Sequence, residues 1–147
     1  AFVEGREHRG RLLSLHQAAP ESPRLARLAA DVEAGRAEAV AQFWTELKSQ
    51  GTPIYEPGTD PGRTTLTLVT FVWRGDAGTR NVLLNCDAVT NIAEQQLVHL
   101  ADTDVWYRSH LLPSASQFYY QFSPDDNLAA VEEQLEGTEV REIEVTV

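Results

Sequence analysis

The sequence predicts an α+β fold that is mainly β, in which an antiparallel β-sandwich follows two N-terminal helices. Two observations predict this class. Between residues 22 and 48, apolar residues recur with the period of an amphipathic helix. After residue 63 the period changes to two, in short apolar runs separated by turn sequences. The chain has 147 residues, which suits a single domain with its own hydrophobic core.

Two short helices are expected ahead of the strands. Ser22 followed by Pro23 is a helix-start signal, because the hydroxyl can cap the first turn and proline fits the first helical position. The apolar stripe of the first helix contains Leu25, Leu28, Ala29 and Val32. Gly35 interrupts the pattern, and a second helix is expected over residues 36–48, before Gly51. The sequence therefore predicts a helical hairpin, or one helix broken at Gly35.

A central strand is expected next. Turn residues dominate residues 55–63, and alternation begins in residues 64–74. The two faces of this strand contain Leu66, Leu68, Thr70 and Val72 on one side, and Val69, Phe71 and Trp73 on the other. Apolar side chains on both faces are typical of a strand in a sheet that is covered on both sides.

The remaining strands follow at short intervals. Strands are expected over residues 80–86, 104–112 and 117–124, and the last two are predicted to pair as a hairpin through a turn at residues 113–116. Residues 88–102 lack a clear period and are predicted to form a loop. The tail 137–147 alternates again, which predicts a final strand. This succession favours an immunoglobulin-like sandwich.

Charge and composition exclude several classes of function. The net charge is −10, which argues against a nucleic-acid duplex or an anionic membrane as the main partner. No apolar run approaches the ~20 residues that a membrane-spanning helix needs. The single cysteine, Cys86, lies in an apolar run and is expected to be a buried, inert side chain.

No catalytic or metal-binding motif is found. The four histidines lack the spacing of a zinc site, and the sequence has no GxSxG nucleophile motif. The aspartates near the expected hairpin lie among polar residues, which is unlike a paired-carboxylate hydrolase site. No catalytic residue, metal ligand or cofactor is therefore expected in this chain.

The aromatic residues of the two last sandwich strands carry the strongest signal. Phe118, Tyr120 and Phe122 alternate on one face, which is expected to be core, whereas Tyr119 lies on the other. In the strand before, a second face contains Trp106, Arg108 and His110. Such a mixed face could pack on another domain, stack on a ring-bearing ligand or support the helices.

An ordered set of motifs resembles one known family. The motifs are "ARLAADVEAGRAEAVAQFWTELKSQGTPIYEP", "VTFVWRGD", "NVLLN" and "LADTDVWYRSHLLPSASQFYYQFSPDDN". Together they resemble the N-terminal domain of the enterochelin (enterobactin) esterases over roughly residues 22–128. The order of these motifs is specific, although no single one is.

The resemblance implies an immunoglobulin-like sandwich of the E-set type and an activity for the whole protein. Residues 1–52 would be an arm and two helices packed on a sandwich of residues 53–147. In the family, an α/β-hydrolase domain follows, cleaves the ester bonds of a cyclic trilactone siderophore and so frees iron inside the cell. The chain would be the non-catalytic N-terminal domain of such a carboxylic ester hydrolase, with the hydrolase domain absent. Its expected partners are that hydrolase domain and the ferric catecholate siderophore, which alone carries the iron. The absence of a visible signal peptide agrees with a cytoplasmic location.

Seven residues are candidates for substrate binding or for contact with the hydrolase domain: Trp73, Arg74, Arg80, Trp106, Arg108, His110 and Tyr119. Arginine and tryptophan suit iron-bound catecholate rings, which are flat and anionic. The resemblance assigns none of these residues a role.

Two alternative functions stay open. One is a purely structural or oligomerising domain, which predicts a flat apolar interface and no concave pocket. The other is a carbohydrate-binding module, which needs coplanar exposed aromatic residues, and Trp73, Trp106 and Tyr119 are the candidates for these.

Overall fold

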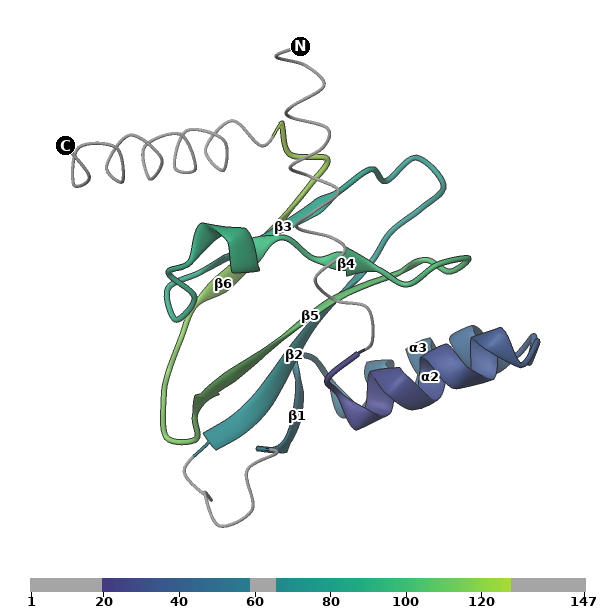
Figure 1. The fold of residues 1–147 in the computed structure, drawn as a ribbon, viewed down its shortest axis with the longest axis horizontal. Helices are drawn as coiled ribbons and strands as arrows, with labels where there is room; N and C mark the ends of the chain where they lie inside the picture. The colour runs from purple at the N-terminus through teal and green to yellow at the C-terminus, as the bar shows by residue number, and fades with distance from the viewer. Residues whose placement is uncertain (1–19, 59–65, 128–147) are drawn as a thin grey trace, which may run out of the picture.

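The computed structural model describes residues 20–58 and 66–127 (Figure 1). The helices are α2 (Pro23–Glu33), α3 (Ala39–Gln50) and the short 3-10 helix η1 (Ile92–Gln95). The strands are β1 (Ile54–Pro57), β2 (Leu66–Arg74), β3 (Val82–Cys86), β4 (Val98–His99), β5 (Val105–Pro113) and β6 (Tyr120–Pro124). The predicted N-terminal arm, most of the predicted turn and the predicted tail strand at 137–147 lie outside the described residues.

Helices α2 and α3 begin and end close to the predicted positions. Ser22 caps α2, because its hydroxyl oxygen accepts a hydrogen bond from the Leu25 N–H at 3.2 Å, and Pro23 occupies the first helical position. Gly35, with a φ of +79°, separates the two helices. Gly51, with a φ of +85°, ends α3. The prediction of two short helices with a joint at Gly35 is confirmed.

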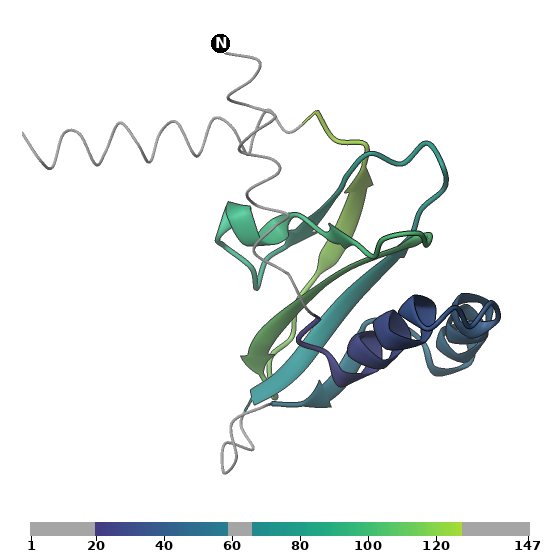
Figure 2. The same cartoon turned by 45° about the vertical axis from the view of Figure 1, so that its right-hand side comes forward.

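The strands form two antiparallel sheets. The larger sheet has the order β1-β2-β5-β4, and the smaller one pairs β3 with β6. The α2–α3 pair covers one face of the larger sheet, and the smaller sheet lies over the opposite face (Figures 1 and 2). The described residues therefore build an α+β fold that is mainly β, as predicted, in three layers.

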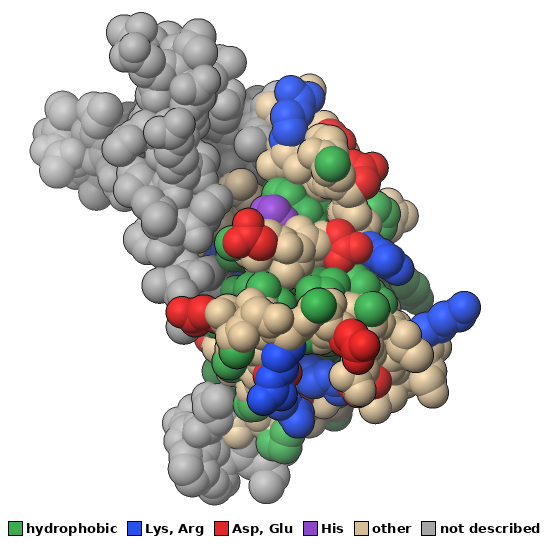
Figure 3. All heavy atoms as spheres, turned by 90° about the vertical axis from the view of Figure 1, so that its right-hand side faces the viewer, with side chains coloured by type: hydrophobic (Ala, Val, Ile, Leu, Met, Phe, Trp, Pro, Cys, Tyr) green, Lys and Arg blue, Asp and Glu red, His purple; other side chains and the backbone are tan. Residues whose placement is uncertain are grey.

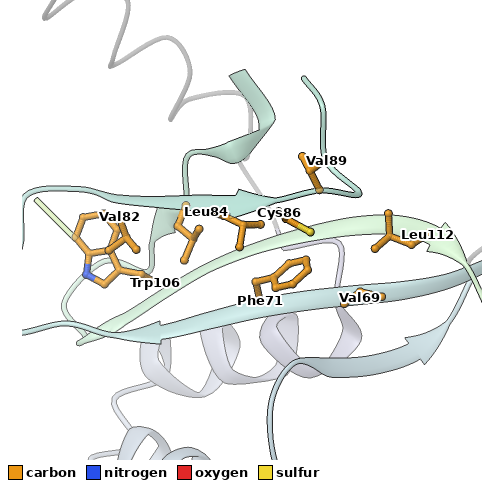
Figure 4. Packing of buried hydrophobic residues seen from close by; sticks show 9 residues of the cluster. Val69, Phe71, Val82, Leu84, Cys86, Val89, Trp106 and Leu112 are labelled. Carbon is orange, nitrogen blue, oxygen red and sulfur yellow. The ribbon is translucent and has the colours of Figure 1, made fainter. Parts of the chain in front are cut away.

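The first hydrophobic core lies between the two sheets. Phe71 of β2 is fully buried, and its ring meets that of Tyr120 of β6 edge to face at a centroid distance of 5.0 Å. Figure 4 shows Leu84 and Cys86 of β3 pointing toward Phe71. Trp106 of β5 closes one end of this layer. The core thus joins four strands that are distant in sequence.

The second hydrophobic core lies between the larger sheet and the helices. Leu25 of α2 and Phe43 of α3 are buried against Val72 of β2 and Tyr107 of β5. Because neighbouring residues of a strand point to opposite faces, β2 and β5 contribute side chains to both cores. The prediction of a central strand covered on both faces is confirmed over Leu66–Arg74, and residues 64 and 65 lie outside the described residues.

The predicted hairpin between residues 104–112 and 117–124 is wrong. β5 pairs with β2 along its whole length, from Val105 with Arg74 to Pro113 with Leu66. After the turn at Ser114 the chain crosses to the smaller sheet, where β6 pairs with β3. The crossing buries the aromatic face of β6 between the sheets, which a hairpin in the plane of β5 would not do.

Three short elements were not predicted. β1 lies in the region expected to be a turn, and η1 and β4 lie in the region expected to be a loop. These segments are too short to show a period. For β4, the two adjacent apolar residues Leu97 and Val98 could have indicated a buried strand, and both are buried.

Candidate functional site

A cavity of about 320 Å³ lies beside the C-terminal half of β5. One edge of β5 pairs with β2, but on the other edge β4 reaches only Trp106 and Tyr107. Among the described strands, none pairs with this edge beyond Tyr107. The cavity lies between this part of β5 and the segment 88–94. The lining residues are Glu21, Ala88, Val89, Thr90, Asn91, Glu94, Arg108, Ser109, His110, Leu111 and Leu112. We call this cavity the Arg108–His110 pocket.

Arg108 is a buried cation with few partners, and only 8% of its surface is exposed. Its Nη1 donates to the Gln96 carbonyl oxygen at 3.3 Å, whereas Nε has no hydrogen-bond partner within the described residues. Burial lowers the pKa of Arg108, and the charges of Glu94 and Glu21 partly oppose this effect. Both glutamates are exposed at the pocket, and neither forms an ion pair with Arg108 in the described structure.

His110 lies two residues further along the same face of β5 and is 9% exposed. Its Nε2 has no hydrogen-bond partner in the part of the chain that the structure describes. The centroid of its ring lies 6.1 Å from that of Phe71. Burial lowers the pKa of His110, and the nearby positive charge of Arg108 lowers it further. The imidazole is therefore neutral at pH 7 and has one N–H donor and one acceptor nitrogen.

The arrangement supports binding rather than acid–base catalysis. Ser109 lies between Arg108 and His110 in sequence, but its hydroxyl is engaged with the Thr70 hydroxyl at 2.7 Å across the β2–β5 pair. Ser109 and His110 point to opposite faces of the strand, so they do not form a nucleophile and base pair. Within residues 20–58 and 66–127, no group of three or more His, Cys, Asp or Glu side chains is placed to hold a metal ion.

Arg74 belongs to a different cluster, at the junction of α3 and the larger sheet. Its Nε donates to Asp104 Oδ2 at 2.9 Å, and its guanidinium lies 5.3 Å from the centroid of the Trp44 ring. The indole Nε1 of Trp44 donates to Asp104 Oδ1 at 2.7 Å. The sequence did not predict Asp104 and Trp44 as partners of Arg74, although both lie in the motifs quoted above.

The other candidate residues are dispersed. Trp73 is half-buried with its ring 5.3 Å from that of Phe122. Trp106 is 7% exposed and stacks on His99. Arg80 is exposed in the connection between β2 and β3, and Tyr119 is 86% exposed. Of these candidates, Arg108 and His110 line the same pocket among the described residues. Trp73 and Trp106 are not exposed as a platform with Tyr119 in this part of the chain.

The helix face of the molecule has mixed charge. Figure 3 shows Lys and Arg side chains interspersed with Asp and Glu on this face. Arg24, for example, forms an ion pair with Glu46, and Arg36 forms one with Asp31. This face therefore offers no large cationic platform for an anionic ligand. None of the helices in the described part of the chain is long and apolar enough to cross a membrane.

Comparison with known proteins identifies one family. The family model described as "Enterochelin esterase, N-terminal" matches residues 68–146, which include most of β2, all of β3 to β6 and all of the pocket except Glu21. No curated protein matches the chain.

Two solved structures are similar to the chain. Ferric enterobactin esterase from Salmonella typhimurium is 26% identical, with a TM-score of 0.47 over 58% of this chain and 24% of that one. Enterobactin esterase from Shigella flexneri, solved in the presence of 2,3-dihydroxy-N-benzoyl-glycine, is 24% identical, with a TM-score of 0.43 over 54% of this chain and 21% of that one. The chain thus spans about a quarter or less of the length of these structures.

Proposed function

Because the chain belongs to the family of enterochelin esterase N-terminal domains, we propose that it is a non-catalytic domain that helps to position a ferric catecholate trilactone for hydrolysis. An α/β-hydrolase domain of the same protein would carry out the ester hydrolysis, in the cytoplasm. Iron would enter only as part of the siderophore, without a resident metal site. The family match carries this proposal.

The Arg108–His110 pocket supports a role in positioning. Its volume of about 320 Å³ lies at the small end of the range for ligand pockets. A pocket of this size accepts one substituted aromatic ring, and a whole trilactone would extend beyond it. The domain would therefore hold one arm of the siderophore and leave the ester bonds accessible to the hydrolase domain.

Electrostatics limit where an anionic siderophore could make contact. The net charge of −10 opposes long-range attraction of a ferric catecholate trianion. Arg74 is neutralised by Asp104, whereas Arg80 is exposed and Arg108 has no carboxylate partner among the described residues. Arg80 and Arg108 are therefore the cations that we expect to contribute to siderophore binding.

Tryptophan fluorescence tests this function. The chain has three tryptophans, and titration with ferric enterochelin should quench their emission saturably, in the micromolar range. The double variant Arg80→Ala, Arg108→Lys should bind at least about tenfold more weakly. Arg36→Ala is the matched control, because Arg36 is an exposed arginine in the joint between the helices, outside the pocket.

Free tryptophan at matched absorbance provides the inner-filter control for this titration. If the protein is quenched no more than free tryptophan, the domain does not contact the siderophore. That result would favour the structural alternative, in which the domain supports the hydrolase domain only.

A further inference from the structure

We propose that the Arg108–His110 pocket is a carboxylate-binding site. The geometry and charge of the pocket support this assignment. Only the identification of the carboxylate as a product of ester hydrolysis rests on the proposed function.

The guanidinium of Arg108 presents one free edge. Its Nη1 is held by the Gln96 carbonyl oxygen at 3.3 Å, which fixes the orientation of the group. Neither Nε nor Nη2 has a hydrogen-bond partner among the described residues, and Nε is fully buried. These two nitrogens form the fork that binds both oxygens of a carboxylate in parallel hydrogen bonds. The described residues thus orient the fork but supply no acceptor for it.

A buried cation without a counterion is costly. Removing an arginine side chain from water costs several kcal/mol unless an opposite charge and hydrogen bonds compensate. The lowered pKa of Arg108 reflects this desolvation. An anion in the pocket would supply the missing compensation, whereas a neutral ligand would supply hydrogen bonds only.

His110 adds a second donor without adding charge. Burial and Arg108 lower its pKa against the opposing effects of the charge and the backbone of Glu94, so it is a neutral imidazole. Its Nε2 has no hydrogen-bond partner among the described residues. A bound carboxylate would favour the tautomer with a proton on Nε2, which donates to a ligand oxygen, over the tautomer with the proton on Nδ1. One cation and one neutral donor suit a monoanion such as a carboxylate better than a phosphate dianion.

The exposed glutamates lower the affinity of the pocket for anions. Glu21 and Glu94 line it, and their charges act on Arg108 without forming ion pairs with it in the described structure. Their negative charges oppose the binding of a carboxylate. Removal of one of them should therefore strengthen carboxylate binding, which an adventitious cavity would not show.

The carboxylate has two potential sources. Hydrolysis of an ester creates a carboxylate that the intact ester lacks, so the pocket could distinguish the product from the substrate. An aspartate or glutamate side chain of the hydrolase domain offers the same chemistry. Benzoate represents the first source, and N-acetyl-aspartate amide, whose only anionic group is a side-chain carboxylate, represents the second.

The test is a nuclear magnetic resonance titration of the chain with each probe up to about 20 mM. Benzoate or N-acetyl-aspartate amide should shift the Arg108 Nε–H and His110 ring signals saturably. Methyl benzoate, which has the same ring and no charge, should not. The probe that binds more tightly identifies the source.

Three variants sharpen the test. Arg108→Lys keeps the charge but loses the fork and should bind at least about tenfold more weakly. His110→Gln should weaken binding less, by about threefold, because a neutral donor is replaced by another. Glu94→Gln, at an exposed position that should leave folding unaffected, should bind about two- to fivefold more tightly.

Two results would overturn the proposal. The first is no saturable shift with either carboxylate in the wild type and in Glu94→Gln, which would leave a water-filled cavity. The second is equal binding of benzoate and methyl benzoate, which would show recognition of the ring alone. Quenching by ferric enterochelin is independent of both results, because the intact trilactone has no free carboxylate. Failure of the carboxylate titration would therefore leave the proposed function intact. Failure of the quenching experiment would likewise leave the carboxylate site intact.

Discussion

Gly75 follows β2 where the indole of Trp106 leaves no room for a side chain. A Cβ atom at this position would lie 2.6 Å from Trp106 Nε1 and 3.0 Å from Thr79 Oγ1. The Gly75 N–H donates to the Asp104 carbonyl oxygen at 2.8 Å, so the backbone has little freedom to retreat. The glycine in the motif "WRGD" is therefore explained by packing against Trp106.

We expect Gly75→Ala to lower the free energy of unfolding by about 1–3 kcal/mol, because the indole must leave its position in the core. Urea denaturation followed by tryptophan fluorescence measures the change. Gly78→Ala is the control, since the nearest atom to its Cβ, Asp76 Oδ1, is at an ordinary 3.4 Å and the effect should stay within about 0.5 kcal/mol. Equal unfolding midpoints for the two variants would contradict this explanation.

For individual residues, the sequence predicted which types of side chain occur in the site but not which groups they contact. Arg74 and Arg108 appeared equivalent, as arginines in strands of the motif set. In the structure, Arg74 pairs with Asp104, whereas the hydrogen bond of Arg108 within the described residues is to the Gln96 carbonyl oxygen. This difference depends on where α3 and η1 pack, which no local pattern specifies.

Among the elements, α2 is fixed at its N-terminus to the edge of the larger sheet. Ser22 is fully buried; its hydroxyl accepts from the Leu25 N–H and donates to Glu56 Oε1 of β1. The second oxygen of Glu56 accepts from the Arg24 N–H at 3.1 Å. The capping residue therefore also joins the helix layer to β1.

Replacement of Ser22 by alanine should cost about 1–2 kcal/mol of stability, because the Leu25 N–H loses its cap and Glu56 loses a donor. Thermal unfolding monitored by circular dichroism measures this change. Thr45→Ala is the matched control: its hydroxyl bonds the Ala41 carbonyl oxygen on the exposed side of α3, and its removal should change stability by less than about 0.5 kcal/mol. A Ser22→Ala protein as stable as Thr45→Ala would rule out this role.

The long elements were predictable and the connections between them were not. α2, β2, β3 and β5 each carry a clear period or capping signal, and the structure has them within a few residues of the predicted bounds. The pairing of β6 with β3 was not visible, because the alternation of Phe118, Tyr120 and Phe122 shows that one face is buried but not against which sheet.

For the whole molecule, the burial of His110 makes stability depend on pH. Its folded pKa lies below the ordinary value of 6.5, so the unfolded chain binds a proton more readily. The contribution of His110 is complete above pH 6.5 and is lost as the pH falls toward the folded pKa. Two charged residues act on the imidazole: Arg108 lowers this pKa, and Glu94 raises it.

The free energy of unfolding should therefore fall between pH 7.5 and 5.5, by at most about 1.4 kcal/mol per pH unit from this group. Urea denaturation across that range measures the slope. Carboxylates contribute little in this window, because their ordinary pKa values lie near 4. In His110→Gln the slope should be smaller, and an identical slope in both proteins would exclude His110 as its source.

The alternation of β5 between two cores has a consequence for insertions and deletions. Trp106 and Leu112 face the smaller sheet and Arg108 and His110 line the pocket, whereas Val105 and Tyr107 face the helices. Loss of one residue after Trp106 would place Arg108 under the helices and remove it from the pocket. Homologous domains should thus vary in length in the turns 76–80 and 114–117, while the interval from Trp106 to Leu112 stays constant.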